Sequence, residues 1–513
     1  MAISLVLAGS RPRAALRLAL LALLAACAPA APARAPAPGS LAALGPEIAT
    51  IFADTVFAHA HWGVVVRSLG TGETIHRQNG GKLFMPASNM KLITGAAVLE
   101  ALGPDFRYRT EVAAAGPVQN GVLRGDWVVR GGGDPSISER FGDGEARTVF
   151  RAWADSLRAH GVTRVAGAIV GVDEYFDGVP YGRGWAWDDL EAYYSAPVAG
   201  LQYNEGAIRV QVFPGRQAGE PGIISLNPPT GHVRIVNETR TVEPGRPPRL
   251  RYTHSDAAGT LLVSGEIPSN TVAVERDVAV REPTRFFVTA LRETLREAGI
   301  QVEGPAVLPG DRDEEGLALG RIAPLFVHHS APMREIIPAF MKPSQNQMAE
   351  MLLKTLGREL RGTGSVAAGV QVVDSLFRGW GFATERQLLM ADGSGLSRYN
   401  YVSPDLLMEL LEHMTRSPNW ETWYASLPIA GVDGTLRARM RDTPAEGNVH
   451  GKTGTLSSVR ALSGYVTTAN GERLIFSMIV NGHALSASDA DRLVDTALSR
   501  LAGFQRRGLP AGR

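Results

Sequence analysis

The pattern of apolar and polar residues predicts short strands followed by a helix at the start of the folded part of the chain. In "HWGVVVRSLGTGETIHRQ", residues 61–78, two apolar-rich runs flank a Gly-Thr-Gly turn, which predicts two short strands. The following stretch, "MPASNMKLITGAAVLEALG", predicts a helix that ends at Gly103. Its apolar positions fit the helical period only loosely, so we expect this helix to be buried on most sides.

The pattern changes between about residue 107 and residue 325. Short β-like runs dominate there, and glycine and proline turns separate them. A polar, glycine-rich link at 307–320 marks the end of this stretch, and helical patterns return after it. Two strands and a final helix at 486–503 close the chain. We therefore expect one domain built from both ends of the chain, with a large β-rich insertion.

The N-terminus has the pattern of a secretory signal. Arg11, Arg13 and Arg17 precede an apolar run that is too short to span a bilayer and ends at Cys27. "LLAAC" resembles the bacterial lipobox, so we expect residues 1–27 to be a lipoprotein signal and Cys27 to be lipidated. The alternative is a chance cysteine in a signal that is cleaved further on. Residues 28–40 are rich in Ala and Pro and predict an extended tether.

Composition excludes some classes of function. The 513 residues include 52 basic and 51 acidic side chains, a net charge of +1, and this balance argues against a nucleic-acid binder. Cys27 is the only cysteine, so no internal disulfide forms. The 11 histidines are scattered without ligand spacing, and we expect no metal and no cofactor. The "GKT" at 451–453 is not a P-loop, because Glu446 stands where the first glycine is required.

Three short motifs carry candidate chemistry. Ser88-x-x-Lys91 places a hydroxyl and an amine on one helical face. A lysine activates a serine only if burial lowers the pKa of its amine. The other two motifs are Ser344-x-Asn346, between two predicted helices, and Lys452-Thr453-Gly454, on a strand.

These motifs, in this chain order, mark penicillin-recognising serine acyltransferases. Ser88 would be the nucleophile and Lys91 its base. Ser344 would relay a proton, Asn346 would hold the substrate amide, and Lys452 with Thr453 would bind a terminal carboxylate. Gly454 would keep the strand bare for the substrate backbone.

The chain resembles the class C low-molecular-mass penicillin-binding proteins, the D-Ala-D-Ala carboxypeptidase/endopeptidase family. The stretches "GGGDPSIS", "WDDLEAYYSAPVAGLQYNE", "ADGSGLSRYNYVSP" and "SLPIAGVDGTL" carry the likeness beyond the motifs, in the family order. The family usually has an acid between Ser344 and Asn346, where this chain has Gln345.

The resemblance implies an α+β fold of the transpeptidase/β-lactamase type, a helical cluster with a five-stranded antiparallel sheet. It implies three parts, namely a catalytic domain from 41–106 and 322–505, an inserted domain beside the active site from 107–205 and 272–321, and a nested β domain from 206–271. It also implies further roles: the N–H of Thr455 in the oxyanion hole, and Ser394, Arg398, Asp189 and Tyr194 near the side chain of the substrate. We expect most of the aromatic residues Trp185, Trp187, Tyr193 and Tyr194 to be core residues.

The implied activity is serine-type hydrolysis of peptidoglycan stem peptides and cross-links through an acyl-enzyme, with covalent binding of β-lactams. The implied location is the periplasm or cell envelope, with a membrane contact only through a lipid anchor. Two alternatives remain open: a β-lactamase with the same acylation step, and a wall-binding protein without catalysis.

Overall fold

The computed structural model of the chain describes residues 41–255, 259–311 and 322–506. The predicted signal at 1–27, with Cys27, and the predicted tether at 28–40 lie outside these residues. In the ranges that are described, no helix is both long enough and apolar enough to cross a bilayer.

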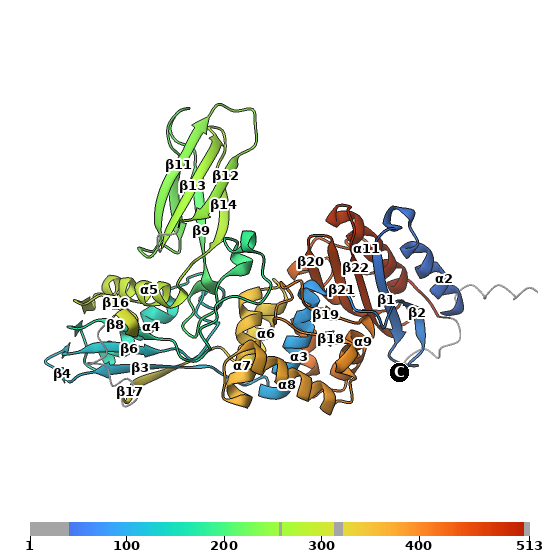
Figure 1. Cartoon of the computed structure of the whole chain (residues 1–513), viewed down its shortest axis with the longest axis horizontal. Helices are drawn as coiled ribbons and strands as arrows, with labels where there is room; N and C mark the ends of the chain where they lie inside the picture. The colour runs from blue at the N-terminus through green and yellow to red at the C-terminus, as the bar shows by residue number, and fades with distance from the viewer. Residues whose placement is uncertain (1–40, 256–258, 312–321, 507–513) are drawn as a thin grey trace, which may run out of the picture.

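A five-stranded antiparallel sheet joins the two ends of the chain (Figure 1). Its order is β2-β1-β22-β21-β20, so β20 forms one edge. Eight of the nine residues of β22 are buried, because both faces of the sheet are covered. The strands are β1 (His61–Ser68), β2 (Thr74–Gln78), β20 (His450–Leu456), β21 (Val459–Thr467) and β22 (Arg473–Asn481).

Helices cover both faces of this sheet (Figure 1). Alternate residues of β22 point to opposite faces: Met478 packs toward α2 and α11, and Ile479 packs toward the larger helical cluster. The two helices of the first face are α2 (Leu41–Phe52) and α11 (Ala487–Ala502). The cluster on the second face contains α3 (Met90–Leu102), α6 (Met333–Met341), α7 (Asn346–Arg361), α8 (Val366–Gly379), α9 (Pro404–Met414) and α10 (Trp420–Ser426), with the short pair β18 (Leu388–Leu389) and β19 (Tyr401–Val402).

Helix α3 lies inside this cluster. Ten of its thirteen residues are buried, as the loose apolar period predicted. The helix ends at Gly103, whose φ of 80° is a conformation that a side chain disfavours. The predicted helix and its end are therefore confirmed, and so is the strand pair β1–β2 before it.

The insertion contains two small sheets and two amphipathic helices, α4 (Thr148–Ala159) and α5 (Pro283–Glu297). Phe150 of α4 and Phe287 of α5 are fully buried and pack edge to face, at a ring distance of 5.0 Å. One sheet has the order β16-β8-β6-β3-β17, from β3 (Arg109–Ala115), β6 (Asp126–Arg130), β8 (Ile169–Val172), β16 (Ala306–Val307) and β17 (Pro324–His329). The other has the order β15-β7-β5-β4, from β4 (Val118–Gln119), β5 (Val122–Leu123), β7 (Arg164–Val165) and β15 (Gln301–Val302).

A nested set of strands projects from the insertion (Figure 1). The order β10-β9-β14 forms one three-stranded sheet, and β11-β13-β12 forms a second. The strands are β9 (Ala207–Phe213), β10 (Ile223–Asn227), β11 (Arg234–Val242), β12 (Arg249–His254), β13 (Thr260–Pro268) and β14 (Val274–Ala279).

Two strand pairings run past predicted domain limits. β14 pairs with β9, so the nested strands continue past residue 271 to Ala279. β17 pairs with β3, so the inserted sheet continues past residue 321 to His329. The polar link at 307–320 suggested a boundary because local composition does not show that the next strand returns to an earlier one.

Candidate active site

Ser88 and Lys91 meet where the chain enters α3. Ser88 lies in the short 3-10 turn η2 (Ala87–Asn89), and Lys91 lies in the first turn of α3. The Lys91 Nζ is 3.0 Å from the Ser88 Oγ. The hydroxyl and the amine are therefore within hydrogen-bond distance, as base catalysis requires.

Lys91 is fully buried. Burial lowers the pKa of its amine to about 7, although the carboxylates of Asp392 and Glu350 oppose the shift. Its Nζ also donates to the Asn346 Oδ1 at 2.6 Å and to the Ser394 carbonyl at 2.8 Å. A neutral amine keeps two N–H donors and one lone pair, so it could make both bonds and still accept the Ser88 proton.

Lys452 is a second fully buried lysine, on β20. Its Nζ donates to the Ser344 Oγ at 2.8 Å and to the Thr453 carbonyl at 3.0 Å. Burial, and then the charge of Lys91, hold the pKa of Lys452 well below its usual value. Ser344 has a φ of 66°, a left-handed conformation that is uncommon for a residue with a side chain.

Asn346 is the first residue of α7 and connects Lys91 to the insertion. Its Oδ1 accepts from Lys91, and its Nδ2 donates to the Tyr194 carbonyl at 2.8 Å. An amide has two oxygen lone pairs and two N–H groups. One of each therefore remains for a ligand.

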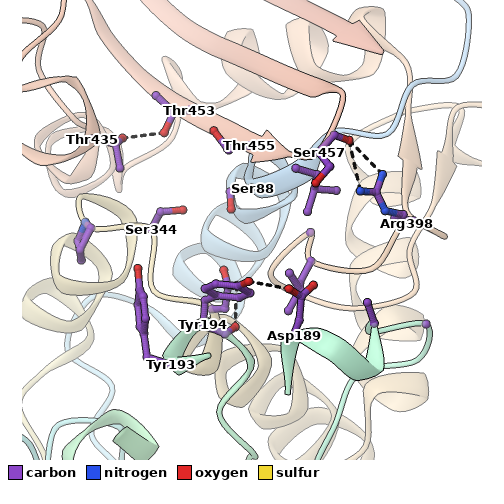
Figure 2. Close-up of a pocket in the computed structure, with 17 residues that line it drawn as sticks. Ser88, Asp189, Tyr193, Tyr194, Ser344, Arg398, Thr435, Thr453, Thr455 and Ser457 are labelled. Atoms are coloured by element: carbon purple, nitrogen blue, oxygen red, sulfur yellow. Dashed lines mark hydrogen bonds between the residues drawn. The ribbon is translucent and has the colours of Figure 1, made fainter. Parts of the chain in front are cut away.

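A cavity of about 430 Å³ opens in front of Ser88, and Figure 2 shows that side chains from the sheet, the helices and the insertion converge on it. Along one wall runs β20, whose alternate peptide groups face away from the sheet because it is an edge strand. The Thr453 Oγ1 lies 2.7 Å from the Thr435 Oγ1 on this side. Eight predicted site residues line the cavity: Ser88, Asp189, Tyr194, Ser344, Asn346, Arg398, Thr453 and Thr455.

Gly454 does not line the cavity, and its surroundings correct the predicted reason for a glycine. A Cβ at this position would meet the Pro86 carbonyl oxygen at 2.5 Å and the Ala87 Cβ at 3.2 Å. The glycine therefore lets the turn that carries Ser88 pack against β20. Its neighbours Thr453 and Thr455, and not Gly454 itself, line the cavity.

Asp189 and Tyr194 lie together on the insertion side of the cavity (Figure 2). The Tyr194 hydroxyl donates to the Asp189 Oδ1 at 2.6 Å. Burial, and then this carboxylate, raise the pKa of Tyr194 to about 12, so the phenol keeps its proton. Among the residues that the structure describes, no basic side chain lies within ion-pair distance of Asp189.

The predicted pair Ser394 and Arg398 separates. Arg398 is exposed at the cavity and donates to the Ser457 carbonyl at 3.2 and 3.3 Å. Ser394 is fully buried and does not line the cavity. Its contribution is the backbone carbonyl that accepts from Lys91. A serine in a Gly-rich turn gives no sequence signal that distinguishes these two roles.

The expectation of core aromatics near the site is wrong. Trp187 is 84% exposed and Tyr193 is 46% exposed. Trp185 and Tyr194 are partly buried, and the Trp185 Nε1 donates to the Asp392 Oδ2 at 3.0 Å. Trp187 lies in the short 3-10 turn η4 (Trp187–Asp189), and Tyr193 and Tyr194 lie in η5 (Tyr193–Ser195), whose two tyrosines line the cavity.

Sequence reasoning missed two buried carboxylates beside Lys91. Glu350 accepts from the Gly393 and Ser394 N–H groups at 3.0 and 2.8 Å, and Asp392 accepts from the Gly395 N–H at 2.8 Å. Burial, and then the charge of Asp392, raise the pKa of Glu350 to about 7. Glu350 lies one helical turn after Asn346, and that spacing was the available signal. Thr435 was also missed, although its stretch was recognised.

Comparison with known proteins agrees with this geometry. Residues 44–502 match the model of the D-Ala-D-Ala carboxypeptidase 3 (S13) family. A D-alanyl-D-alanine carboxypeptidase of Actinomadura sp. (strain R39) is 37% identical over 489 residues, covering 92% of this chain and 87% of the relative. The carboxypeptidase DacB of Haemophilus influenzae is 26% identical over 452 residues, covering 86% and 89%.

The fold has a solved counterpart. The crystal structure of penicillin binding protein 4 (dacB) from Haemophilus influenzae matches with a TM-score of 0.74 at 24% identity, covering 89% of this chain and 97% of that one. The predicted α+β fold class is confirmed. From the family match and the 37% identical relative it follows that the chain belongs to the D-Ala-D-Ala carboxypeptidase 3 (S13) family, the class C low-molecular-mass penicillin-binding proteins.

Proposed function

We propose that this carboxypeptidase hydrolyses the D-Ala-D-Ala ends of peptidoglycan stem peptides, and their cross-links, through an ester on Ser88. One observation carries the assignment. The Lys91 Nζ lies 3.0 Å from the Ser88 Oγ, and burial brings the pKa of this amine to about 7. An amine with this pKa is in large part neutral at physiological pH and accepts the serine proton.

The positions of the side chains around Ser88 support the following steps of acylation. The Ser88 Oγ attacks the carbonyl of the penultimate D-Ala, and Lys91 takes the hydroxyl proton. The N–H groups of Ser88 and Thr455 stabilise the oxyanion. The C–N bond then breaks, and the proton that Lys91 took from Ser88 passes to the departing amine by way of Ser344 and Lys452, which are 2.8 Å apart, so that Lys91 is neutral again.

Deacylation uses the same residues in reverse. Lys91 removes a proton from water, which attacks the ester carbonyl, and Lys91 returns that proton to the Ser88 oxygen as the ester bond breaks. The paired hydroxyls of Thr453 and Thr435 line the cavity and would hold a terminal carboxylate, with the buried Lys452 behind Thr453. Asn346 would hold the substrate amide with its remaining donor and acceptor.

The assignment is tested by intact mass after incubation with a penicillin, with wild type and Ser88→Ala in parallel. Wild type should gain one penicillin mass, and Ser88→Ala should gain none. An adduct on Ser88→Ala would overturn the role of Ser88. Turnover of an acyl-D-Ala-D-Ala peptide separates this enzyme from a wall-binding protein without catalysis, and the lifetime of the penicillin adduct separates it from a β-lactamase.

We also propose an envelope location, with a lipid anchor at Cys27. The basic and apolar pattern before Cys27 supports this proposal. Wild type should partition with membranes and need detergent for release, because lipoproteins carry several acyl chains. Cys27→Ser should remain uncleaved or become soluble. A wild-type protein that is soluble, with an N-terminus beyond Ala28, would contradict the anchor.

A further inference from the structure

Gln345, between Ser344 and Asn346, is held from two sides. Its side chain is almost fully buried, and its two amide atoms have different partners. The Oε1 accepts from the Met348 N–H at 3.3 Å and caps α7. The Nε2 donates to the Glu205 Oε2 at 2.9 Å, across 140 residues of sequence. The residue after the proposed proton relay is thus bonded to the insertion.

The Glu205 side chain is in turn held in place by hydrogen bonds. Arg140 donates to both of its oxygens, from Nε at 2.6 Å and from Nη2 at 3.0 Å. The Glu205 side chain is only 14% exposed. Glu205 and its neighbour Asn204 both have left-handed φ angles, 56° and 48°, in η6 (Asn204–Gly206). Two consecutive residues persist in this conformation only where their surroundings define it.

Ser344 has few other restraints. Its Oγ is bonded to Lys452, and its own φ is 66°. The next peptide is held by the Gln345 N–H, which donates to the Phe340 carbonyl at 2.9 Å. The chain Arg140–Glu205–Gln345 therefore restrains the strained turn that presents the Ser344 hydroxyl to the cavity.

From these contacts we propose that Gln345 is a positioning residue for Ser344, and that this role requires a neutral donor at position 345 facing the carboxylate at position 205. The proposal rests on the function proposed above, because Ser344 must act in proton transfer. Gln345 itself touches no substrate and acts through the serine.

The charged groups around Gln345 and Glu205 determine how a second carboxylate at position 345 should behave. A cavity of about 120 Å³ is lined by Gln345 and Glu205 together with Glu139, Arg140, Tyr193, Arg209 and Asp277. Arg209 is paired with Asp277 at 2.9 Å, and Arg140 is committed to Glu205. Lys452 lies beyond Ser344, and Lys91 and Glu350 lie near Asn346. No unpaired cation of this set faces position 345, so a second carboxylate there would be repelled by Glu205.

Gln345→Glu places two carboxylates at hydrogen-bond distance. They bond when they share a proton at low pH and separate when both ionise. We expect the ratio of variant to wild-type kcat to fall with rising pH, with KM little changed. A displacement of Ser344 near 1 Å costs up to about a hundredfold in rate. Gln119→Glu, on the exposed strand β4, adds the same charge to the insertion and should leave the ratio flat.

The exchange Gln345→Glu with Glu205→Gln reverses donor and acceptor. The amide introduced at position 205 would donate to the carboxylate introduced at position 345 and keep its one oxygen for the Arg140 Nε–H, so the double variant should recover part of the lost kcat and lose the pH-dependence of the ratio. A structural role for overall folding would not give this pH-dependent recovery. If Gln345→Glu does not accumulate as folded protein, the double exchange must still do so.

Two results would overturn the proposal: a pH-independent ratio for Gln345→Glu, or a double exchange no better than the single variant. Ser88→Ala is measured beside each variant with a penicillin. If wild type forms no adduct, the proposed function fails. If wild type acylates and Gln345→Glu follows its pH profile, only the role of Gln345 fails.

Discussion

In the proposed mechanism, the charge state of Lys91 decides when Ser88 becomes a nucleophile. Burial brings the pKa of its amine to about 7, and only the neutral form accepts a proton. We therefore expect the rate of penicillin acylation to rise with pH and to level off above about 7. Below that pKa the rate should fall about tenfold per pH unit, as the neutral fraction does. Stopped-flow acylation between pH 5 and 9 measures the profile, and a flat profile would contradict a lysine base.

Glu350 provides a second prediction at this scale. Its carboxylate raises the pKa of Lys91 through its charge. Glu350→Gln removes the charge and keeps an oxygen that accepts from the Ser394 N–H. The acylation profile should therefore shift to lower pH, while the maximum rate stays close to that of wild type. A shift to higher pH would contradict this effect, and no shift would show that Glu350 is already neutral at the pH where Lys91 titrates.

The sequence predicted part of this arrangement. Short-range spacing indicated that Ser88 and Lys91 share a helical face, and chemistry required that Lys91 be buried. Glu350 and Asp392 were not predicted, because an acid in a helix or a turn is usually exposed and only the packed structure shows that these two are not. The backbone contact of Ser394 with Lys91 was not predicted either, because the residue type does not report a backbone contact.

At the scale of elements, the contact between η2 and β20 places the nucleophile against the strand. Gly454→Ala would put a Cβ 2.5 Å from the Pro86 carbonyl oxygen. Overpacking of this kind costs about 1–3 kcal/mol of stability, and a shift of the turn by about 1 Å costs on the order of a hundredfold in rate. We expect a lower Tm together with slower acylation.

The matched control for Gly454→Ala is Gly379→Ala. Gly379 ends α8, and a Cβ added to it would have no other atom within 4 Å. Alanine there should leave acylation unchanged and should not lower the Tm. If both variants acylate at the wild-type rate, the close packing of η2 on β20 does not position Ser88.

Individual helices and strands were predicted better from the sequence than the pairing of one strand with another. The α3 helix with its Gly103 end and the strand pair β1–β2 follow from local pattern. The pairings β14–β9 and β17–β3 do not, because a strand's residues show that it pairs but not with which strand. These pairings run about eight residues past two of the predicted domain limits, 271 and 321.

At the scale of the whole molecule, α7 connects the insertion to the catalytic core. Its N-terminal residue Asn346 bonds the Tyr194 carbonyl at 2.8 Å. Two turns later the buried Lys354 pairs with Asp177 at 2.7 Å and donates to the Val179 carbonyl at 2.6 Å. Since the same helix carries Glu350, the insertion and the environment of Lys91 share one rigid element.

The insertion also brings a carboxylate to the cavity that, among the described residues, has no ion-pair partner. Asp189 lines it, with one oxygen bonded to the Tyr194 hydroxyl. The resemblance to the family implies substrates that carry diaminopimelate, whose side chain ends in an ammonium. A partly buried charge pair contributes about 1.5–3 kcal/mol, roughly ten- to a hundredfold in kcat/KM. We expect Asp189→Asn to lower kcat/KM by that factor for peptides with a free diaminopimelate amine.

Two other ligands distinguish a role of Asp189 in substrate recognition from a role in supporting the fold. Penicillin and a plain acyl-D-Ala-D-Ala peptide lack the ammonium, so Asp189→Asn should process both at nearly the wild-type rate. Asp188 is exposed beside it, and Asp188→Asn is the matched control that should change none of the three rates. Equal losses on all three ligands would mean that Asp189 supports the turn over the cavity. A loss confined to the diaminopimelate peptide would mean that the insertion selects the substrate by charge.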